Sequence, residues 1–301
     1  MPISISGEDL HQWKKWAVQL AKANDIDPYE IEWLLQGLTT LPALRIKLDD
    51  YREQHSILCS VTLSQLTQKW QSRVFDRAPL QYLVGETPWR DFSIAVTPDV
   101  LIPRPETELI IDLAKALALN SSIAECCYEG NWADIGTGSG AIALGLAKAF
   151  PKATIFATDI SEQALKVAQR NMESNHLSGH ISFLRGSWLE PLTYMKEQLT
   201  GIISNPPYIP SQTVLTLQPE VSNHEPHLAL DGGIDGLSYL RILVEESADY
   251  LQVGGLWLAE LMEGQANTVA DLLDVQGQYT NIAIHEDLSG IERFVSAYKA
   301  L

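Results

Sequence analysis

The sequence predicts an α/β fold, in which a mostly parallel sheet of seven strands follows a small helical domain. From about residue 105 onward, apolar runs of strand length alternate with helical patterns, as in a parallel sheet covered by helices. The first 85 residues lack this alternation and show helical periodicity only. The 301 residues, 46% of them hydrophobic, suffice for a globular chain of two domains.

Residues 1–85 are predicted to form a helical domain with a small core of its own. Asp27 is suited to cap a helix that has Pro28 in its first position and Glu30 three residues after the cap. Thr62 is suited to cap another helix. We interpret the apolar side chains that follow as core residues rather than a ligand site: Ile31, Leu34, Leu35 and Leu38, then Leu63, Leu66, Trp70 and Val74.

Residues 86–104 are predicted to form a β-hairpin that links the two domains. Residues 89–96 alternate in part between apolar and polar side chains. Thr97-Pro98-Asp99 is a turn sequence, and the apolar residues 100–102 come after it.

Residues 105–301 are predicted to form the sheet domain. No helical pattern separates the last two strands, which predicts that they are antiparallel neighbours. Segment 209–236 has no clear strand, and its histidines and acids lack the spacing of a metal-binding helix. We therefore expect a mobile lid there and no metal site. The predicted strands are 131–136, 153–159, 180–185, 199–205, 255–261, 280–285 and 291–298.

A glycine-rich turn follows the first predicted strand, in the sequence Asp134-Ile135-Gly136-Thr137-Gly138-Ser139-Gly140. Glycines allow positive φ and let a ligand approach the backbone closely. Asp159 ends the next strand, where an acid can accept hydrogen bonds from both ribose hydroxyls of a nucleoside. The turn lacks the dinucleotide fingerprint and the Gly-Lys-Ser/Thr of a phosphate-binding loop. It predicts a cofactor with adenosine but no pyrophosphate, of which S-adenosylmethionine is the common one.

Asn205-Pro206-Pro207-Tyr208 follows the buried strand pattern of residues 201–204. Two prolines stiffen the turn and leave carbonyl oxygens without partners in the sheet. Those oxygens and the Asn205 amide suit a planar substrate NH₂ group, and Tyr208 can cover its face. Together with the glycine turn and Asp159, this motif predicts a methyltransferase that uses S-adenosylmethionine.

Charge is distributed unevenly between the two predicted domains. Residues 1–85 carry 9 Lys and Arg against 10 Asp and Glu, whereas residues 86–301 carry 12 against 28, so the sheet domain holds nearly all of the net charge of −17. An acidic domain repels a phosphate backbone, which disfavours direct binding of nucleic acid.

Other segments indicate a cytoplasmic protein that does not contact a membrane. No apolar stretch approaches the ~20 residues that cross a bilayer. Residues 1–9 lack the pattern of a signal peptide. Cys59, Cys126 and Cys127 form neither a zinc pattern nor a disulfide framework, which predicts free thiols in a reducing compartment.

Several blocks of the sequence resemble the HemK family, the glutamine-N5 methyltransferases that modify bacterial peptide chain release factors. The resemblance runs from about residue 80 to the end, and the first domain matches in length and helical character only. The closing block, residues 287–293, has Ile291 where the family usually has a more polar residue. The other blocks are residues 80–85, 101–108, 134–140, 204–209 and 225–233.

The resemblance implies a class I S-adenosylmethionine-dependent methyltransferase with a Rossmann-like sheet. Trp188 falls where the family stacks a residue near the adenine, although core packing explains it equally well. Arg104 and Glu106 either reach the methionine end of the cofactor or form an ion pair that orients the linker. The implied cofactor residues are Gly136, Thr137, Gly138, Ser139, Gly140, Asp159, Trp188 and Asn205, and the implied catalytic residues are Asn205, Pro206, Pro207 and Tyr208.

The resemblance also implies that a release factor is the protein substrate, that S-adenosylhomocysteine is the product, and that the reaction affects translation termination. The helical first domain would then dock the protein substrate. A glutamine of a ribosomal protein and an adenine N6 of nucleic acid are alternative substrates, because both present the same kind of NH₂ group. A non-enzymatic adaptor should have lost some of the motif residues, and all of them are intact.

Overall fold

The computed structural model describes residues 3–301. Met1 and Pro2 lie outside the described residues, although the predicted helical domain and the residues compared with a signal peptide both begin there. The chain forms two compact units. The first extends to Glu86 and also contains residues 218–224, and the second contains residues 87–217 and 225–301. None of the helices among residues 3–301 is long and apolar enough to cross a membrane.

The first unit is a helical bundle around one apolar core. Its longer helices, α1, α2 and α4, bury Leu10, Ile31, Leu35, Leu66 and Trp70 completely. All of the predicted stripe residues except Leu63 are buried, and Leu63 is partly buried against the same core, which confirms that the stripes are core. The elements are β1 (Ile3–Ile5), α1 (Gly7–Ala23), α2 (Tyr29–Leu38), α3 (Ala43–Leu48), β2 (Ile57–Cys59), α4 (Leu63–Phe75) and α5 (Leu80–Val84).

Capping residues fix where these helices begin. The Thr62 hydroxyl accepts the N–H of Gln65, and the Gln65 side chain accepts the N–H of Thr62, which forms a capping box. Helix α2 begins one residue later than predicted, because Pro28 is its N-cap residue and makes no side-chain cap, while the Asp27 carboxylate accepts the N–H of Tyr29 at 3.0 Å. The expectation of helices alone was incomplete, because β1 and β2 pair as short antiparallel strands. Strands of three residues are too short to show an alternating pattern.

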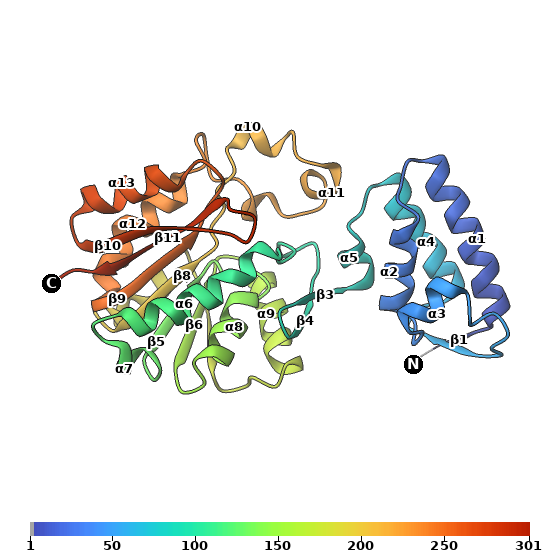
Figure 1. Cartoon of the computed structure of the whole chain (residues 1–301), viewed down its shortest axis with the longest axis horizontal. Coiled ribbons are helices and arrows are strands. Elements are labelled where there is room, and N and C mark those ends of the chain that lie inside the picture. Colours follow the sequence, from blue (N-terminus) through green and yellow to red (C-terminus); the bar gives the residue numbers. More distant parts are fainter. Residues whose placement is uncertain (1–2) are drawn as a thin grey trace. The chain divides into compact units, whose positions relative to one another are not determined.

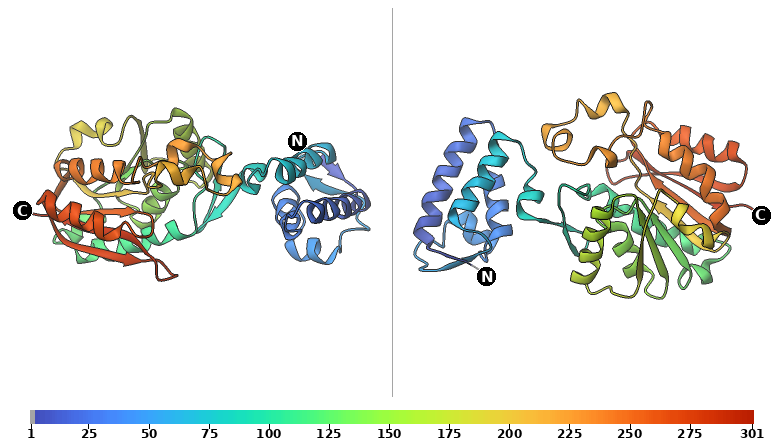
Figure 2. Two further views of the ribbon diagram at one scale, coloured as in Figure 1. Left: turned by 90° about the horizontal axis from the view of Figure 1, so that it is seen from above. Right: turned by 180° about the vertical axis from the view of Figure 1, so that it is seen from behind.

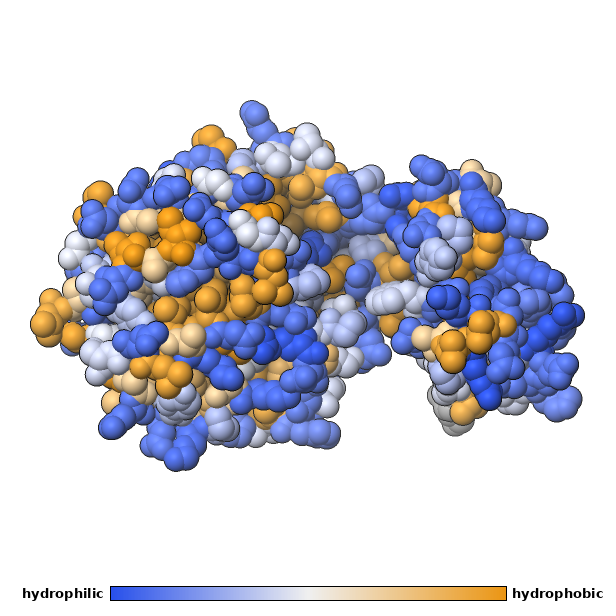
Figure 3. Space-filling model, viewed as in Figure 1, coloured by the Kyte–Doolittle hydropathy of each residue, from blue (hydrophilic) through white to orange (hydrophobic). Residues whose placement is uncertain are grey.

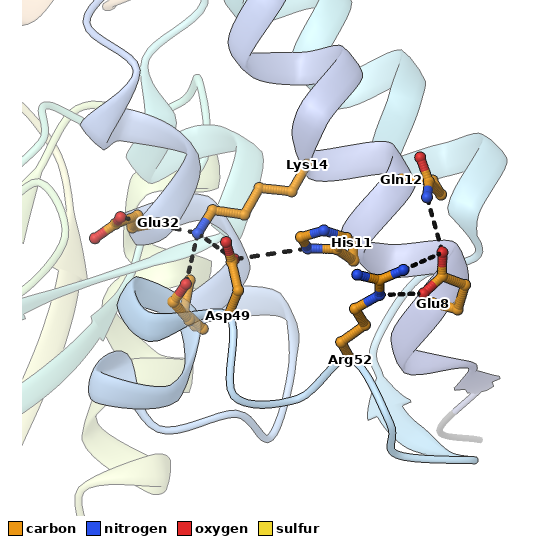
Figure 4. Close-up of polar contacts among 8 residues, drawn as sticks. Glu8, His11, Gln12, Lys14, Glu32, Asp49 and Arg52 are labelled. Atoms are coloured by element: carbon orange, nitrogen blue, oxygen red, sulfur yellow. Dashed lines mark hydrogen bonds and ion pairs between the residues drawn. The ribbon is translucent and has the colours of Figure 1, made fainter.

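Charged side chains, some partly buried and some exposed, connect the elements of the first unit. Lys14 donates to the Ile46 carbonyl at 2.5 Å and to Asp49 at 2.8 Å, and Arg52 pairs with Glu8 (Figure 4). A lysine at the end of a buried stem needs such acceptors, because its charge is costly away from water.

The segment 218–224 enters the first unit through ion pairs. Glu220 in α11 (Pro219–Ser222) lies 2.8 Å from Arg73 and 2.7 Å from Arg77. Arg73 is nearly buried and also pairs with Glu30 of α2. The ring of His224 contacts the Asp76 carbonyl at 2.6 Å. The chain therefore leaves the second unit for seven residues and returns to it.

The second unit is a seven-stranded sheet with helices on both faces. Its strands are β5 (Asn131–Ile135), β6 (Thr154–Asp159), β7 (Ile181–Arg185), β8 (Leu199–Ser204), β9 (Leu251–Glu260), β10 (Tyr279–Glu286) and β11 (Glu292–Lys299), and a separate two-stranded sheet holds β3 (Glu86–Trp89) and β4 (Phe92–Ala95). Its helices are η1 (Glu106–Glu108), α6 (Leu109–Asn120), α7 (Ala124–Cys127), α8 (Ala141–Ala149), α9 (Glu162–Ser174), η2 (Glu190–Met195), α10 (Ser211–Val214), η3 (His227–Ala229), α12 (Ser238–Tyr250) and α13 (Ala266–Gln276).

The strand order is β10-β11-β9-β8-β5-β6-β7. The five strands from β9 to β7 are parallel, and β11 is antiparallel to both of its neighbours. Helices α6, α8 and α9 cover one face, and α12 and α13 cover the other (Figures 1 and 2). The chain order reverses between β5 and β8, and ligands of open α/β sheets bind outside the strand ends at such a point.

All seven predicted strands are present, and the last two are antiparallel neighbours as expected. Strand β9 begins at Leu251, four residues before its predicted start at 255, because Gly254 and Gly255 hide the pattern. The predicted hairpin was misplaced. Its turn lies at Arg90 and Asp91 between β3 and β4, with Arg90 at a φ of 51°, and residues 100–102 form no strand.

Candidate active site

A cavity of about 480 Å³ lies at the carboxyl ends of the parallel strands in the second unit. The loops after β5, β6, β7 and β8 contribute to it, together with residues before and within η1, residues before and within η3, and Tyr239 of α12. Its lining includes Pro98, Leu101, Arg104, Thr107, Gly136, Thr137, Gly138, Ser139, Asp159, Ile160, Trp188, Asn205, Pro207, Leu228 and Tyr239.

The glycine turn after β5 exposes its backbone to this cavity. Gly136 and Gly138 have φ values of 76° and 54°, a region that other residues rarely adopt. A Cβ added at Gly138 would meet no atom within 4 Å, so the space beside it is open. Gly140 differs, because its Cβ would lie 2.9 Å from that of Ala168. Gly140 therefore allows α8 to begin close to α9.

Asp159, the last residue of β6, is tied to the same turn. Its Oδ2 accepts the N–H of Gly138 at 2.9 Å, and its Oδ1 accepts the N–H of Ser161 at 2.8 Å. Burial raises the pKa of the Asp159 carboxyl, and the two backbone hydrogen bonds oppose that rise. Each oxygen keeps a further lone pair for a ligand hydroxyl.

Two buried side chains behind the turn hold its shape. Asp134 accepts the Thr137 hydroxyl at 2.5 Å and the N–H of Ala143 at 3.0 Å. Burial raises the pKa of Asp134 to about 7, and these hydrogen bonds oppose that effect. Asn171 donates to the Ser139 carbonyl at 2.8 Å from the other side. The turn is thus fixed before any ligand arrives.

Trp188 forms part of the cavity wall. Its backbone has a φ of 48°, and its carbonyl accepts the Thr158 hydroxyl at 2.9 Å. The indole packs against the apolar core and lies 4.8 Å from the ring of Tyr239, centroid to centroid. This position is compatible with both predicted roles of Trp188, stacking near an adenine and packing in the core, because the indole packs against the core and also lines the cavity.

The Asn-Pro-Pro-Tyr turn leaves the sheet beside the glycine turn, since Ser204 of β8 pairs with Ile135 of β5. Asn205 Nδ2 donates to the Thr107 hydroxyl at 3.2 Å. The Tyr208 hydroxyl donates to Glu260 Oε1 at 3.2 Å. With its NH₂ held by Thr107, Asn205 offers its Oδ1 as an acceptor to a ligand.

Arg104 forms an ion pair with Glu225, at a distance of 2.7 Å. Glu225 has a side chain only 2% exposed and also accepts the N–H of Ile102 at 3.4 Å. Arg104 therefore connects the segment before η1 to the loop after α11. Glu106 is exposed and has no such buried partner within the described part of the chain.

Full-length relatives decide the family. The chain is 49% identical to the release factor glutamine methyltransferase of Synechocystis sp. over 293 residues, which is 97% of each chain. It is 43% identical to that of Thermosynechococcus vestitus, over 97% of this chain and 99% of the relative. The chain belongs to the release factor glutamine methyltransferase family. The resemblance to HemK proteins is thereby confirmed, and residues 109–234 also match the family model "Methyltransferase small domain".

Solved structures show that this methyltransferase has a class I methyltransferase fold. The catalytic domain of hMettl16, crystallised with the MAT2A 3′UTR hairpin 6, superimposes with a TM-score of 0.55. The two chains are 14% identical, and the match covers 88% of each. At that identity the likeness concerns the fold alone.

Most of the predicted site residues of this methyltransferase line one cavity. The exceptions are Gly140, Pro206 and Tyr208, which follow or lie between lining residues but are not part of the lining. Sequence reasoning missed Thr107, Glu225 and Glu260 as neighbours of the site, although the first two lie inside blocks that resemble the family. The sequence also contains an indication that Glu260 is functional, since an acid at the end of a buried strand is unusual. Across residues 3–301, no group of three His, Cys, Asp or Glu side chains is placed to hold a metal ion.

The Arg104–Glu225 pair predicts a pH-dependent loss of stability in Arg104→Ala. Burial raises the pKa of Glu225 above its ordinary 4.5, and Arg104 opposes that rise. A carboxyl whose pKa is higher in the folded state makes stability fall as pH rises from about 4.5 toward the raised value. The variant should lose about 1–3 kcal/mol of unfolding free energy at pH 8 and less at pH 5. Urea unfolding at both pH values measures this difference.

The matched control is the double variant Arg104→Ala with Glu225→Gln, which has no buried carboxylate and should lose stability equally at both pH values. Equal losses in the single variant would show that the Glu225 charge does not depend on Arg104.

Proposed function

We propose that this methyltransferase transfers the methyl group of S-adenosylmethionine to the N5 atom of a glutamine in a peptide chain release factor. The products are the N5-methylglutamine protein and S-adenosylhomocysteine. The reaction would take place in the cytoplasm and would tune translation termination. The observation that carries this proposal is the 49% identity with a release factor glutamine methyltransferase over 97% of both chains.

The cavity has the features that S-adenosylmethionine requires. The Asp159 carboxylate suits the two ribose hydroxyls, and the open backbone at Gly138 allows close approach. Ile160 and Trp188 supply apolar walls for an adenine ring. The volume of about 480 Å³ is within the range of small-molecule sites. When bound, the cofactor supplies a methyl group activated by a positively charged sulfur.

The chain itself has to orient the substrate amide. The lone pair of an amide nitrogen is delocalised, so the nitrogen is a poor nucleophile and gains most from correct placement. Asn205 Oδ1 and the Pro206 carbonyl can each accept one N–H of the glutamine side chain. The nitrogen then faces the methyl group in line with the bond that breaks. Since the alkylated nitrogen is acidic, it loses its proton after transfer, and no strong base is needed beforehand.

The substrate can be tested directly. Purified release factor, ribosomal proteins and RNA are each incubated with the enzyme and methyl-labelled cofactor, and mass spectrometry locates the label. We expect a mass increase of one methyl group on a glutamine of the release factor. Label on a ribosomal-protein glutamine or on adenine would replace the proposed substrate by one of the alternatives.

Asp159→Ala should weaken the binding of S-adenosylmethionine about 10- to 150-fold, because hydrogen bonds from two hydroxyls to a carboxylate contribute about 1.5–3 kcal/mol. Isothermal titration calorimetry on the folded variant measures the Kd. Glu162→Gln is the control, since Glu162 is exposed at the start of α9 and lies outside the cavity lining. Unchanged affinity in Asp159→Ala would remove Asp159 from the cofactor site.

Asn205→Ala should lower kcat at least ~100-fold, because a nucleophile misplaced by about 1 Å can lose that much. The cofactor should still bind, because the prolines keep the turn. Asn205→Asp tests the hydrogen bond to Thr107. It keeps an acceptor but cannot donate to the Thr107 hydroxyl, so we expect it to be nearly as slow as the Ala variant. Single-turnover methylation measures both rates, and near-normal turnover of Asn205→Ala would place the amide acceptor elsewhere.

We further propose that the first unit docks the protein substrate. Its surface carries exposed apolar side chains, among them Tyr29 at 70%, Leu44 at 67% and Phe75 at 59% exposure. Apolar groups also stand among polar ones on the face of this unit in Figure 3. Exposed aromatic residues are the typical anchors of protein interfaces.

Replacing Tyr29 and Phe75 together by Ser should raise the KM for the intact release factor about 10-fold, because two interface anchors are lost. The Kd of the cofactor should not change, since neither residue lines the cavity. Val275→Ser, at a still more exposed apolar position on α13, is the control for a general surface effect. If KM stays at the unsubstituted value, this part of the surface does not bind the substrate.

A further inference from the structure

Glu260 lies behind the Asn-Pro-Pro-Tyr turn and outside the lining of the cavity. It is the last residue of β9, and the neighbouring residue Ala259 pairs with Ser204 of β8. The carboxyl is thus fixed by strand register beside Asn205. Only 1% of Glu260 is exposed, and its Oε1 accepts the Tyr208 hydroxyl.

Thr107 lies between Glu260 and Asn205. Its hydroxyl accepts the Asn205 amide N–H at 3.2 Å, and the same hydroxyl stabilises the charged form of Glu260. A hydroxyl has one hydrogen, and while its lone pair faces Asn205 that hydrogen needs another acceptor. Glu260 Oε2 is the acceptor at hand, because it is buried and has no hydrogen-bond partner among the described residues, so its contact with Thr107 is not yet a formed hydrogen bond. Such contacts commonly tighten when the substrate binds.

We infer that Glu260 is a positioning residue that sets, through Thr107, which way the Asn205 side-chain amide faces. This inference rests on the proposed function of Asn205. An ionised Glu260 accepts the Thr107 hydrogen, so the hydroxyl presents a lone pair to Asn205 Nδ2. The Asn205 Oδ1 then faces the substrate. The same carboxylate holds Tyr208, so one buried charge fixes both ends of the turn.

Protonation of Glu260 reverses the arrangement. A neutral carboxyl can donate to Thr107, which frees the Thr107 hydrogen to bond with Asn205 Oδ1, and the amide then turns its NH₂ toward the substrate. Four groups face Glu260: Tyr208 after β8, Thr107 and Glu106 of η1, and Arg293 of β11. Burial raises the pKa of Glu260 to about 7, Glu106 adds to the rise, and the other three oppose it.

The first test is structural and requires no substrate. In the full ¹⁵N-labelled protein, the Asn205 side-chain NH₂ signals should shift between pH 6 and pH 8 with one midpoint, and Asn205→Ala assigns them. In Glu260→Gln this shift should vanish while the protein stays folded. An unchanged shift in Glu260→Gln, or signals that do not respond to pH in the unsubstituted protein, would overturn the inference whatever the substrate of the enzyme is.

The second test separates positioning from structural support. Thr107→Val keeps the side-chain shape and removes the hydroxyl, and it should lower kcat about 10-fold, the equivalent of one hydrogen bond. Thr107→Ser retains the hydroxyl and should restore most of the rate. KM for the release factor should change less than twofold in both. Because Thr107 acts through Asn205, Thr107→Val in an Asn205→Ala background should cost nothing more.

Three results would contradict the role of Thr107: a normal kcat in Thr107→Val, no rescue by Thr107→Ser, or losses that multiply in the double variant. If the unsubstituted enzyme fails to methylate the release factor, the proposed function fails, and the NMR test still decides the role of Glu260.

Discussion

The in-register pairing of β5 with β6 and β8, and of β8 with β9, is the constraint on which the site depends. Parallel strands end at the same edge, so residues that are far apart in sequence follow one another along it. Asp159, Gly136, Asn205 and Glu260 stand at or directly after four adjacent strand ends. A register change of one residue in any of these strands would turn its terminal side chain to the opposite face of the sheet.

The site combines a stiff backbone with buried acids. Prolines fix the turn after β8, and positive-φ glycines fix the turn after β5. Asp134, Asp159 and Glu260 lie close to these turns, and burial raises the pKa of each. A buried carboxylate is costly unless nearby N–H and O–H groups stabilise it. The donors that lower this cost include backbone N–H groups and hydroxyl groups of the two turns. The hydrogen bonds that stabilise the buried carboxylates therefore also keep the turns rigid.

The sequence predicts the strands well, because each buried parallel strand is a short apolar run with turn residues at its ends. It also predicts the glycine turn, Asp159 and Asn205, since their chemistry depends on local spacing. The β1–β2 pair and the turn at Arg90 were missed, because short strands carry little pattern. Thr107 and Glu225 were not predicted as partners of Asn205 and Arg104, because contacts between residues about 100 or more positions apart leave no periodic signal.

The excursion of residues 218–224 into the first unit has a topological consequence. The polypeptide passes between the two units three times, after Glu86, after Leu217 and after His224. A protease cut in the segment after Glu86 would therefore leave residues 1–86 attached to the rest of the chain only by their non-covalent contacts with segment 218–224, such as the ion pairs of Glu220. The first unit would also lack a native segment if it were expressed alone, because α11 is encoded more than 130 residues beyond Glu86. Each of the two compact units is thus built from two separate segments of the chain, and a cut at any single position would not divide the sequence into the two units.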